Sequence, residues 1–201
     1  VINLEPISLE DVLDTLRAVG RAAGVAGRGE VVVADLRRRT DAVAARSARV
    51  ADRPRVVLLE WLDPPFSCGH WSPELVRLAG GDEAIGRAGR PSRTLPWEEI
   101  LAARPDVLFV ACCGFDLNRT LADVPSLAAR PGWADLPAVR SGRVYVTDGN
   151  AYFSRPGPRL VDGLEILAHA LRPDVHPLPP GLPAARQLTP AELGAGEAVG
   201  A

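Results

Sequence analysis

The chain has 201 residues, of which 47% are apolar and 24% charged, and its formal net charge is −2. All 23 basic residues are arginine, which excludes functions that need a lysine amine, such as a P-loop or a Schiff base. The slightly acidic balance and the scattered arginines are not typical of a nucleic-acid-binding protein, and no apolar run approaches the roughly 18 residues of a membrane span.

The N-terminal segment predicts a helix that begins after Ser8 and ends near Gly24. Ser8 and Asp11 have the spacing of a capping box, and apolar residues recur at helical spacing as far as Val19. The chain contains no Met and begins without a leader-like segment. We therefore expect a processed chain or a piece of a longer one.

A second, longer helix is expected over residues 30–51. Its apolar residues are sparse, and arginines fill most of the remaining positions. This pattern fits a helix that packs along one narrow stripe. Two interpretations stay open: a solvated surface helix, or a helix that braces two lobes.

From residue 53 onward, the pattern is that of strands alternating with helices. Strands are expected at 55–61, 106–112 and 143–147, and helices at 72–79 (with Ser72 as N-cap), 96–103, 117–129 and 158–171. Apolar runs separated by helices are typical of a parallel sheet covered on both faces. We therefore predict an α/β fold, a Rossmann-like three-layer sandwich. Residues 173–201 are rich in Pro, Gly and Ala, and we expect a disordered or loosely attached tail.

Most of the aromatic residues follow the predicted strands. Six of the ten lie at the strand ends or in the loops after them: Trp61, Phe66, Trp71, Phe115, Tyr152 and Phe153. Ligands bind beyond the carboxyl ends of the strands in open parallel sheets. The clustering predicts a pocket for a large, flat, partly apolar ligand; the alternative is that these side chains cap the open end of the core.

The sequence contains no standard enzyme motif. Its three cysteines, Cys68, Cys112 and Cys113, do not indicate a disulfide framework. With His70 they offer soft metal ligands, but their spacing matches no standard zinc pattern. Buried structural cysteines are the favoured interpretation, and His70 either ties its loop to the backbone or meets a ligand.

Four segments carry a family resemblance: EWLDPPFSCGHW (60–71), PELVRLAGG (73–81), PDVLFVACCGF (105–115) and GWADLPAVRSGRVYVTDGNAYFSRPGPRLVDGLEILA (132–168). They resemble the cobalamin-binding branch of the iron-siderophore/vitamin B12 substrate-binding proteins of ABC importers, the class III periplasmic binding proteins. The resemblance covers residues 1–172. It implies a bilobal protein whose α/β lobes are joined by one long helix, with most of the N-terminal lobe missing from this chain.

The resemblance also implies a division of the chain into three parts. Residues 1–52 would be a helical segment that includes the interlobe helix, 53–172 the C-terminal ligand-binding lobe, and 173–201 the tail. Phe66, Trp97, Tyr152 and Phe153 match aromatic positions that face the ligand in the family, next to Arg155. The full expected ligand-binding set is Trp61, Phe66, His70, Trp71, Trp97, Gly114, Phe115, Tyr152, Phe153 and Arg155.

Glu98 and Glu99 lie near the acidic position with which the family docks onto the permease. The other interpretation, which we favour, is that they are carboxylates opposing the dipole at a helix N-terminus.

The function implied is that of a non-enzymatic ABC-importer component that binds cobalamin or a related corrinoid and delivers it to the permease. We expect a monomer with no catalytic cofactor and no metal site, the corrinoid being the transported ligand. The expected location is periplasmic, or extracellular and membrane-anchored, with a cytoplasmic one left open. The alternatives are a ferric-siderophore or haem-binding protein of the same class, and a cytoplasmic corrinoid-handling or metal-dependent enzyme that uses Cys68, His70 and Cys113.

Overall fold

A six-stranded sheet forms the centre of the molecule in a computed structural model that describes residues 2–194. The strands are β1 (Arg55–Leu62), β2 (Pro65–Ser67), β3 (Asp82–Glu83), β4 (Val107–Val110), β5 (Val144–Val146) and β6 (Arg186–Gln187). Their order is β2-β1-β4-β5-β6, with β3 also paired to β1. β1, β3, β4 and β5 are parallel, whereas β2 and β6 are antiparallel to their neighbours.

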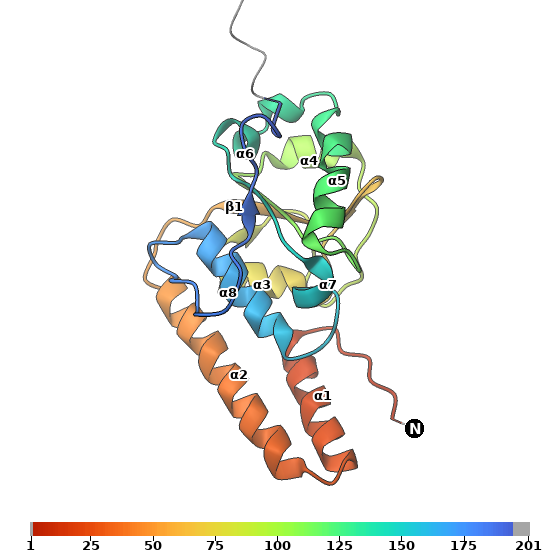
Figure 1. Cartoon of the computed structure of the whole chain (residues 1–201), viewed down its shortest axis with the longest axis vertical. Coiled ribbons are helices and arrows are strands. Elements are labelled where there is room, and N and C mark those ends of the chain that lie inside the picture. The colour runs from red at the N-terminus through yellow and green to blue at the C-terminus, as the bar shows by residue number, and fades with distance from the viewer. Residues whose placement is uncertain (1, 195–201) are drawn as a thin grey trace, which may run out of the picture.

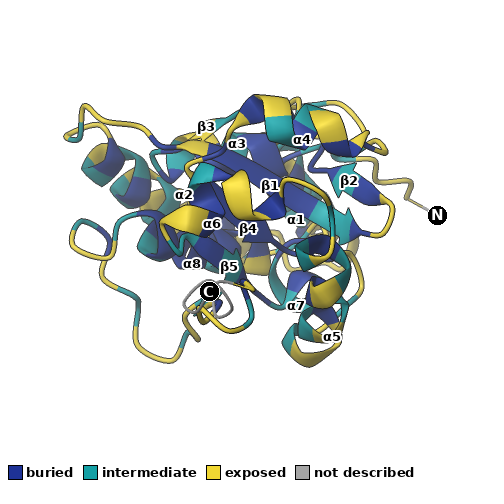
Figure 2. Ribbon diagram, turned by 90° about the horizontal axis from the view of Figure 1, so that it is seen from above, coloured by how far each residue is buried: buried dark blue, intermediate teal, exposed yellow. Residues whose placement is uncertain are grey.

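Successive residues of the central strands enter two different apolar cores, one on each face of the sheet. Val56 and Leu58 of β1 belong to one core, and Val57 and Leu59 to the other. This alternation follows from the period-2 geometry of a strand buried on both faces. Figure 2 shows the buried strands between the helices. The predicted three-layer α/β sandwich is confirmed.

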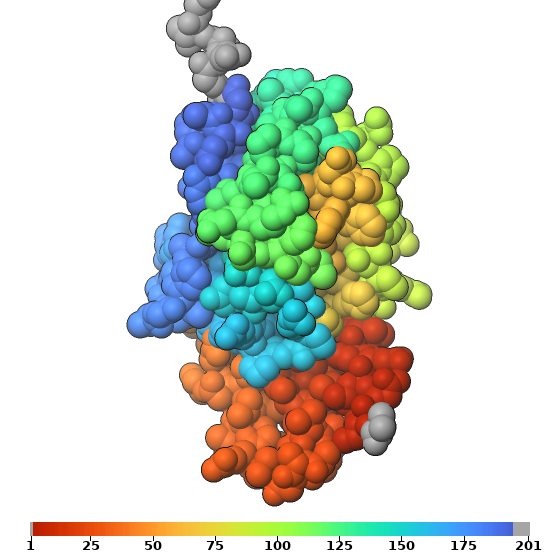
Figure 3. Space-filling model, turned by 45° about the vertical axis from the view of Figure 1, so that its right-hand side comes forward, coloured from red at the N-terminus to blue at the C-terminus, as the bar shows by residue number. Residues whose placement is uncertain are grey.

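The helices divide between these two faces. The first core includes residues of α3 (Ser72–Leu78), α8 (Arg159–Leu171), α1 (Leu9–Ala22) and α2 (Ala26–Ser47). The second includes residues of α4 (Trp97–Ala103), α5 (Leu117–Ala128), α6 (Pro137–Arg140) and the 3-10 helix η1 (Trp133–Asp135). α7 (Gly149–Tyr152) follows β5 at its carboxyl end. α1 and α2 pack side by side at one end of the molecule, beyond α3 and α8 (Figures 1 and 3).

The predicted capping box of α1 is confirmed. The hydroxyl of Ser8 accepts from the backbone N–H of Asp11 at 3.1 Å, and the Asp11 carboxylate accepts from the backbone N–H of Ser8 at 3.0 Å. α2 begins at Ala26, earlier than the expected residue 30. Gly27 and Gly29, which are poor helix formers, hide its first turn in the sequence.

An ion-pair cluster fastens α2 to α8. Arg39 lies 2.5 Å from Asp162 and 2.5 Å from Glu165. Val33, Leu36 and Val43 bury the narrow apolar stripe of the same helix. α2 is therefore packed against the lobe rather than solvated on all sides. No helix within residues 2–194 is both long and apolar enough to cross a membrane.

The prediction of a disordered tail is wrong for residues 173–194. β6 pairs with β5 through Tyr145 and Gln187, and Leu188 and Leu193 are each 3% exposed. Leu193 also accepts a hydrogen bond at its backbone oxygen from the Trp133 indole at 3.1 Å. Isolated apolar residues among prolines carry no periodicity, so the sequence does not reveal this packing. Residues 195–201 lie outside the described residues.

His176 fastens the same C-terminal segment to α2. Arg46 Nε donates to His176 Nδ1 at 3.3 Å, which places the ring proton on Nε2, 3.2 Å from the hydroxyl of Ser47. That hydroxyl donates in turn to the backbone oxygen of Leu78 at 2.8 Å. Burial lowers the pKa of His176, and the charge of Arg46 lowers it further. The network therefore requires a neutral imidazole.

Leu188→Ala should lower the free energy of unfolding by about 3 kcal/mol, because it leaves a cavity where β6 meets the core. Ala184→Ser, at an exposed position of the same segment, should change it by less than about 0.5 kcal/mol. Urea denaturation measures both. Equal, small effects would mean that the segment contributes nothing to the fold.

Acidification should weaken the fold through His176. Since the folded pKa lies below the ordinary value of 6.5, the unfolded chain takes up the proton first. The contribution of neutral His176 to the free energy of unfolding is complete above that value. It is lost as the pH falls, by at most about 1.4 kcal/mol per pH unit. Denaturation between about pH 7.5 and about pH 5.5 should show that the free energy of unfolding of His176→Gln falls less steeply with decreasing pH than that of the wild type. The same slope in both proteins would contradict this role.

Candidate ligand-binding site

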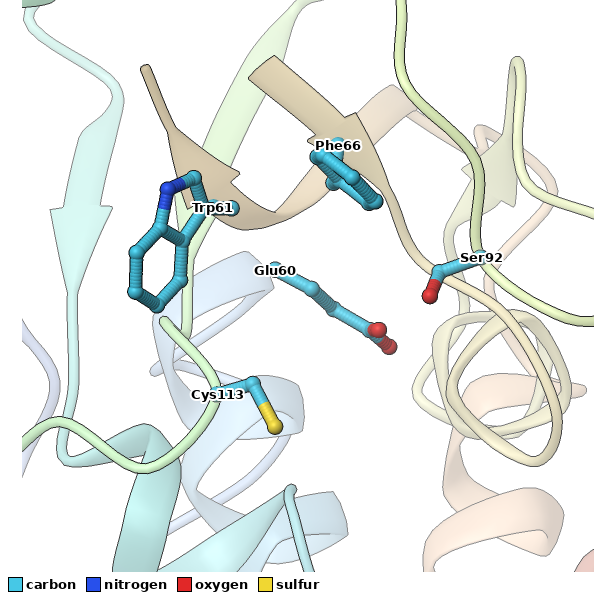
Figure 4. Close-up of a pocket in the computed structure, with 5 residues that line it drawn as sticks. All are labelled: Glu60, Trp61, Phe66, Ser92 and Cys113. Atoms are coloured by element: carbon cyan, nitrogen blue, oxygen red, sulfur yellow. The ribbon is translucent and has the colours of Figure 1, made fainter. Parts of the chain in front are cut away.

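An open hollow of about 340 Å³ lies at the carboxyl edge of the sheet. It is lined by Glu60 and Trp61 from β1, Phe66 from β2, Ser92, and Cys113 after β4 (Figure 4). The volume is at the lower end of the range for small-molecule pockets. Because the hollow opens to solvent, it forms one wall of a site for a larger ligand.

A second, narrower hollow of about 100 Å³ adjoins the first and shares Glu60 and Cys113 with it. Its remaining lining residues are His70, Trp71, Ala111, Phe153 and Ser154. Together the two hollows collect residues that follow β1, β4 and β5. This is the edge at which the sequence predicts a pocket.

The close approach of two loops shapes the rim of the first hollow. A Cβ on Gly69 would lie 2.3 Å from the backbone nitrogen of Ser92, so only glycine fits there. The next residue, His70, donates its backbone N–H to Arg90 at 2.6 Å and has a φ of 50°. This positive φ is unusual for a residue other than glycine. These two contacts between the loops hold Ser92 at the first hollow, whose lining also includes Phe66.

Glu60 is the charged residue of the hollow. Its Oε1 accepts from the backbone N–H of Gly69 at 3.2 Å and from the hydroxyl of Ser72 at 3.2 Å. The sequence predicts Ser72 as the N-cap of α3. This prediction is wrong: the Ser72 hydroxyl binds Glu60, and the N-cap residue is Trp71. Burial raises the pKa of Glu60, and the hydrogen bonds from its neighbours offset part of the rise.

A second partly buried carboxyl, that of Glu83 on β3, has a structural role. It accepts backbone N–H groups of Leu58, Ile85 and Gly86 at 3.1, 3.1 and 2.9 Å. Burial raises its pKa to about 7 despite these bonds. Burial also raises the pKa of the neighbouring Cys68 thiol. Cys68 is 1% exposed, as expected for a structural cysteine, while His70 and Cys113 line the hollows.

Several predicted site residues do come together. Trp61 and Phe66 line the first hollow, and the Phe115 ring lies 4.5 Å from that of Trp61. Trp71 and Phe153 line the second hollow with His70, although both are at least nine-tenths buried. The Trp71 indole donates to the backbone oxygen of Phe153 at 2.9 Å. These two aromatics therefore also close the core, as the alternative interpretation supposed.

Other predicted residues lie outside the lining of the two hollows. Trp97 is 8% exposed, its indole donates to Pro131 at 2.7 Å, and its ring stacks on Trp133 at 6.4 Å. Tyr152 packs against the first core. For both residues, contact with a ligand stays a prediction.

The rest of the predicted set is at the surface. The backbone N–H of Gly114 donates to the hydroxyl of Ser154 at 3.1 Å, and exposed Arg155 donates to the Asn150 amide at 3.1 Å. Glu98 is exposed. Glu99 pairs with Arg93, which lowers the pKa of the carboxyl.

Sequence reasoning missed Glu60, Ser92 and Ser154 as lining residues. Glu60 interrupts the apolar run RVVLLEW, and a charge inside a strand buried on both faces is a signal that could have been used. Ser92 and Ser154 carry no such signal, because their places depend on how the loops fold together. β2 was also missed: the segment read as a loop turns back and pairs with β1.

The fold thus places an open, mainly apolar hollow at the carboxyl edge of a parallel sheet. The periplasmic binding protein family model matches residues 2–151. The chain belongs to this family and has the fold of its class III members.

Solved structures of the same class are similar to this chain. The periplasmic heme-binding protein RhuT from Roseiflexus sp. RS-1 in apo form has 29% identity and a TM-score of 0.70, covering 85% of this chain and 65% of that one. An ABC transporter substrate-binding protein from Listeria monocytogenes EGD-e has 19% identity and a TM-score of 0.75, covering 86% and 68%. An ABC-type Fe3+-hydroxamate transport system structure from Saccharomonospora viridis has 23% identity and a TM-score of 0.69, covering 82% and 56%.

The chain thus spans 65% of the length of RhuT. A search of curated proteins finds no match. The family is that of periplasmic binding proteins, and the structures from Listeria monocytogenes and Saccharomonospora viridis belong to ABC-type transport systems.

Gly69→Ala should lower the free energy of unfolding by about 2 kcal/mol, since the new Cβ meets the backbone of Ser92. Gly157→Ala is the matched control, because a Cβ there meets nothing within 4 Å, and its effect should stay below about 0.5 kcal/mol. Thermal denaturation at several scan rates compares them. If the two variants are equally stable, the loop contact at Gly69 does not constrain the rim.

Proposed function

We propose that this protein is the substrate-binding component of an ABC importer and that its ligand is cobalamin or a related corrinoid. The observation that carries the proposal is the apolar hollow with Trp61 and Phe66 in its wall, supported from behind by Phe115. Aromatic faces on a fixed backbone suit a large, flat, partly apolar ligand. The resemblance of 60–71 and 132–168 to the cobalamin-binding branch supports the choice of ligand.

Haem or a ferric siderophore is the second candidate ligand. Two of the similar structures support it: RhuT is a heme-binding protein, and the Saccharomonospora viridis structure is of an Fe3+-hydroxamate transport system. Both are anionic ligands and call for cations in the site. Arg155 is the clearest candidate, because its partner, the Asn150 amide, is neutral and leaves the charge uncompensated.

The enzyme alternative finds less support in the positions of its residues. It needs Cys68, His70 and Cys113 to act together. Cys68 is buried beside Glu83, whereas Cys113 is exposed in the hollow. Within residues 2–194, no three His, Cys, Asp or Glu side chains are grouped so that they could hold a metal ion.

The proposal also assigns a location and a partner. The protein would act as a monomer outside the cytoplasmic membrane, in the periplasm or anchored at the cell surface, and would deliver its ligand to a permease. Glu98 is exposed on the first turn of α4 and is the better placed of the two predicted docking carboxylates, because Arg93 already pairs with Glu99.

Calorimetric titration with cyanocobalamin tests the ligand and the wall of the hollow together. The wild type should bind in the micromolar range or tighter. Phe66→Ala should bind about ten-fold more weakly, because it removes an aromatic face from the site. Tyr145→Ala is the control: Tyr145 is a partly buried aromatic that packs against the first core and does not line either hollow.

The Tyr145→Ala control should bind cyanocobalamin with the affinity of the wild type. An absence of binding by the wild type would overturn the choice of ligand, and equal affinity of Phe66→Ala would overturn the role of the aromatic wall. Trp97→Phe in the same titration tests the contact predicted for Trp97.

A further inference from the structure

The carboxyl group of Glu60 lies where the two hollows meet. Glu60 is the charged residue among those lining the first hollow and one of two titratable carboxyl or imidazole groups, with His70, lining the second. Figure 4 shows the side chain extending from β1 with its carboxyl group on the side of Ser92, between Phe66 and Cys113. A ligand seated on Trp61 and Phe66 therefore meets this group at the bottom of the site.

The hydrogen bonds of Glu60 leave acceptor capacity for a ligand. The backbone N–H of Gly69 and the hydroxyl of Ser72 both donate to Oε1, and the hydroxyl of Ser92 also hydrogen-bonds the carboxyl group. An ionised carboxylate offers about four acceptor positions. An acceptor position therefore remains for an N–H or O–H of a ligand, while the three protein donors hold the group in a fixed orientation.

Three arginines bordering the hollow do little to offset the charge of Glu60 for an arriving anion, because each already has an acidic partner. Arg130 pairs with Asp63 at 2.8 Å, in the loop between β1 and β2. Arg119 lies over the ring of Phe115 and pairs with Asp123 at 2.5 Å. Arg93, next to Ser92, pairs with Glu99. The charges of these three arginines are compensated inside the protein, so none of them is free to offset the repulsion between Glu60 and an anionic group of a ligand.

We propose that Glu60 is a specificity-determining residue that accepts a hydrogen bond from an amide N–H at the ligand's periphery and rejects a carboxylate at the same place. The inference rests on the proposed function, and it narrows the ligand to one with neutral amide side chains. A partly buried carboxylate discriminates strongly here: it makes a charge-assisted hydrogen bond with the amide and repels the acid. An acid would also be taken out of water without a partner.

The experiment compares cyanocobalamin with its separated monocarboxylic acid isomers, in each of which one side-chain amide is hydrolysed. The wild type should bind at least one isomer about ten-fold more weakly than cyanocobalamin, and the other isomers nearly as well. Glu60→Gln keeps the size of the side chain and an acceptor for Gly69 and Ser72. This variant should bind cyanocobalamin about ten-fold more weakly than the wild type does. It should bind the isomer that the wild type disfavours at least as tightly as it binds cyanocobalamin.

Asp41→Asn is the matched control. It removes one carboxylate at an exposed position of α2 that lines neither hollow, and it should keep the wild-type discrimination. If Glu60 had only a structural role, Glu60→Gln would bind cyanocobalamin and all its acid isomers more weakly by the same factor, and the ratio of their affinities would not change. That result, or equal wild-type affinity for every isomer, would overturn the inference while leaving corrinoid binding intact.

A wild type that binds haem but not cyanocobalamin would overturn the proposed function, and the inference would fall with it. The two failures are distinguishable, because only the second abolishes cyanocobalamin binding by the wild type.

Discussion

Burial of β1 on both faces is the constraint on which the rest of the structure depends. β1 pairs with β2, β3 and β4, and its residues from Val56 to Leu59 are 0% exposed. The two apolar cores meet at this strand, and the helices of both layers pack against it and its neighbours. Past Leu59 this cover is interrupted for two residues, before Leu62 returns to the second core. These two residues, Glu60 and Trp61, emerge there into an open hollow. The position of the site is thus a consequence of this interruption in the cover of β1.

The elements of the sequence with a strong local pattern were predictable. The apolar runs of β1 and β4, the capping box at Ser8 and the stripe of α8 each follow from local periodicity or spacing. The aromatic clustering after the strands correctly indicated the edge that carries the hollows. The features that the sequence did not predict depend on contacts between residues distant in sequence. They are the short strand β2, the pairing of β6, and the burial of Leu188 and Leu193.

The candidate site was predictable in kind but not in detail. Aromatic residues could be counted from the sequence, but whether each faces the core or the solvent depends on tertiary packing. Trp61 and Phe66 face the hollow, while Trp97 stacks on Trp133 in the second core. The polar residues were harder still, because Ser92 reaches the hollow only through the contact of its loop with Gly69. Glu60 was recognisable only as a charge out of place in a buried strand.

We propose that a flat ligand with amide side chains packs on Trp61 and Phe66 and donates a hydrogen bond from one amide to Glu60. The most direct test is a crystal structure of the protein with cyanocobalamin. We expect corrin atoms in van der Waals contact with both rings, and a side-chain amide nitrogen about 2.9 Å from a Glu60 carboxyl oxygen. A corrinoid bound elsewhere, or one that turns an apolar edge towards Glu60, would contradict it.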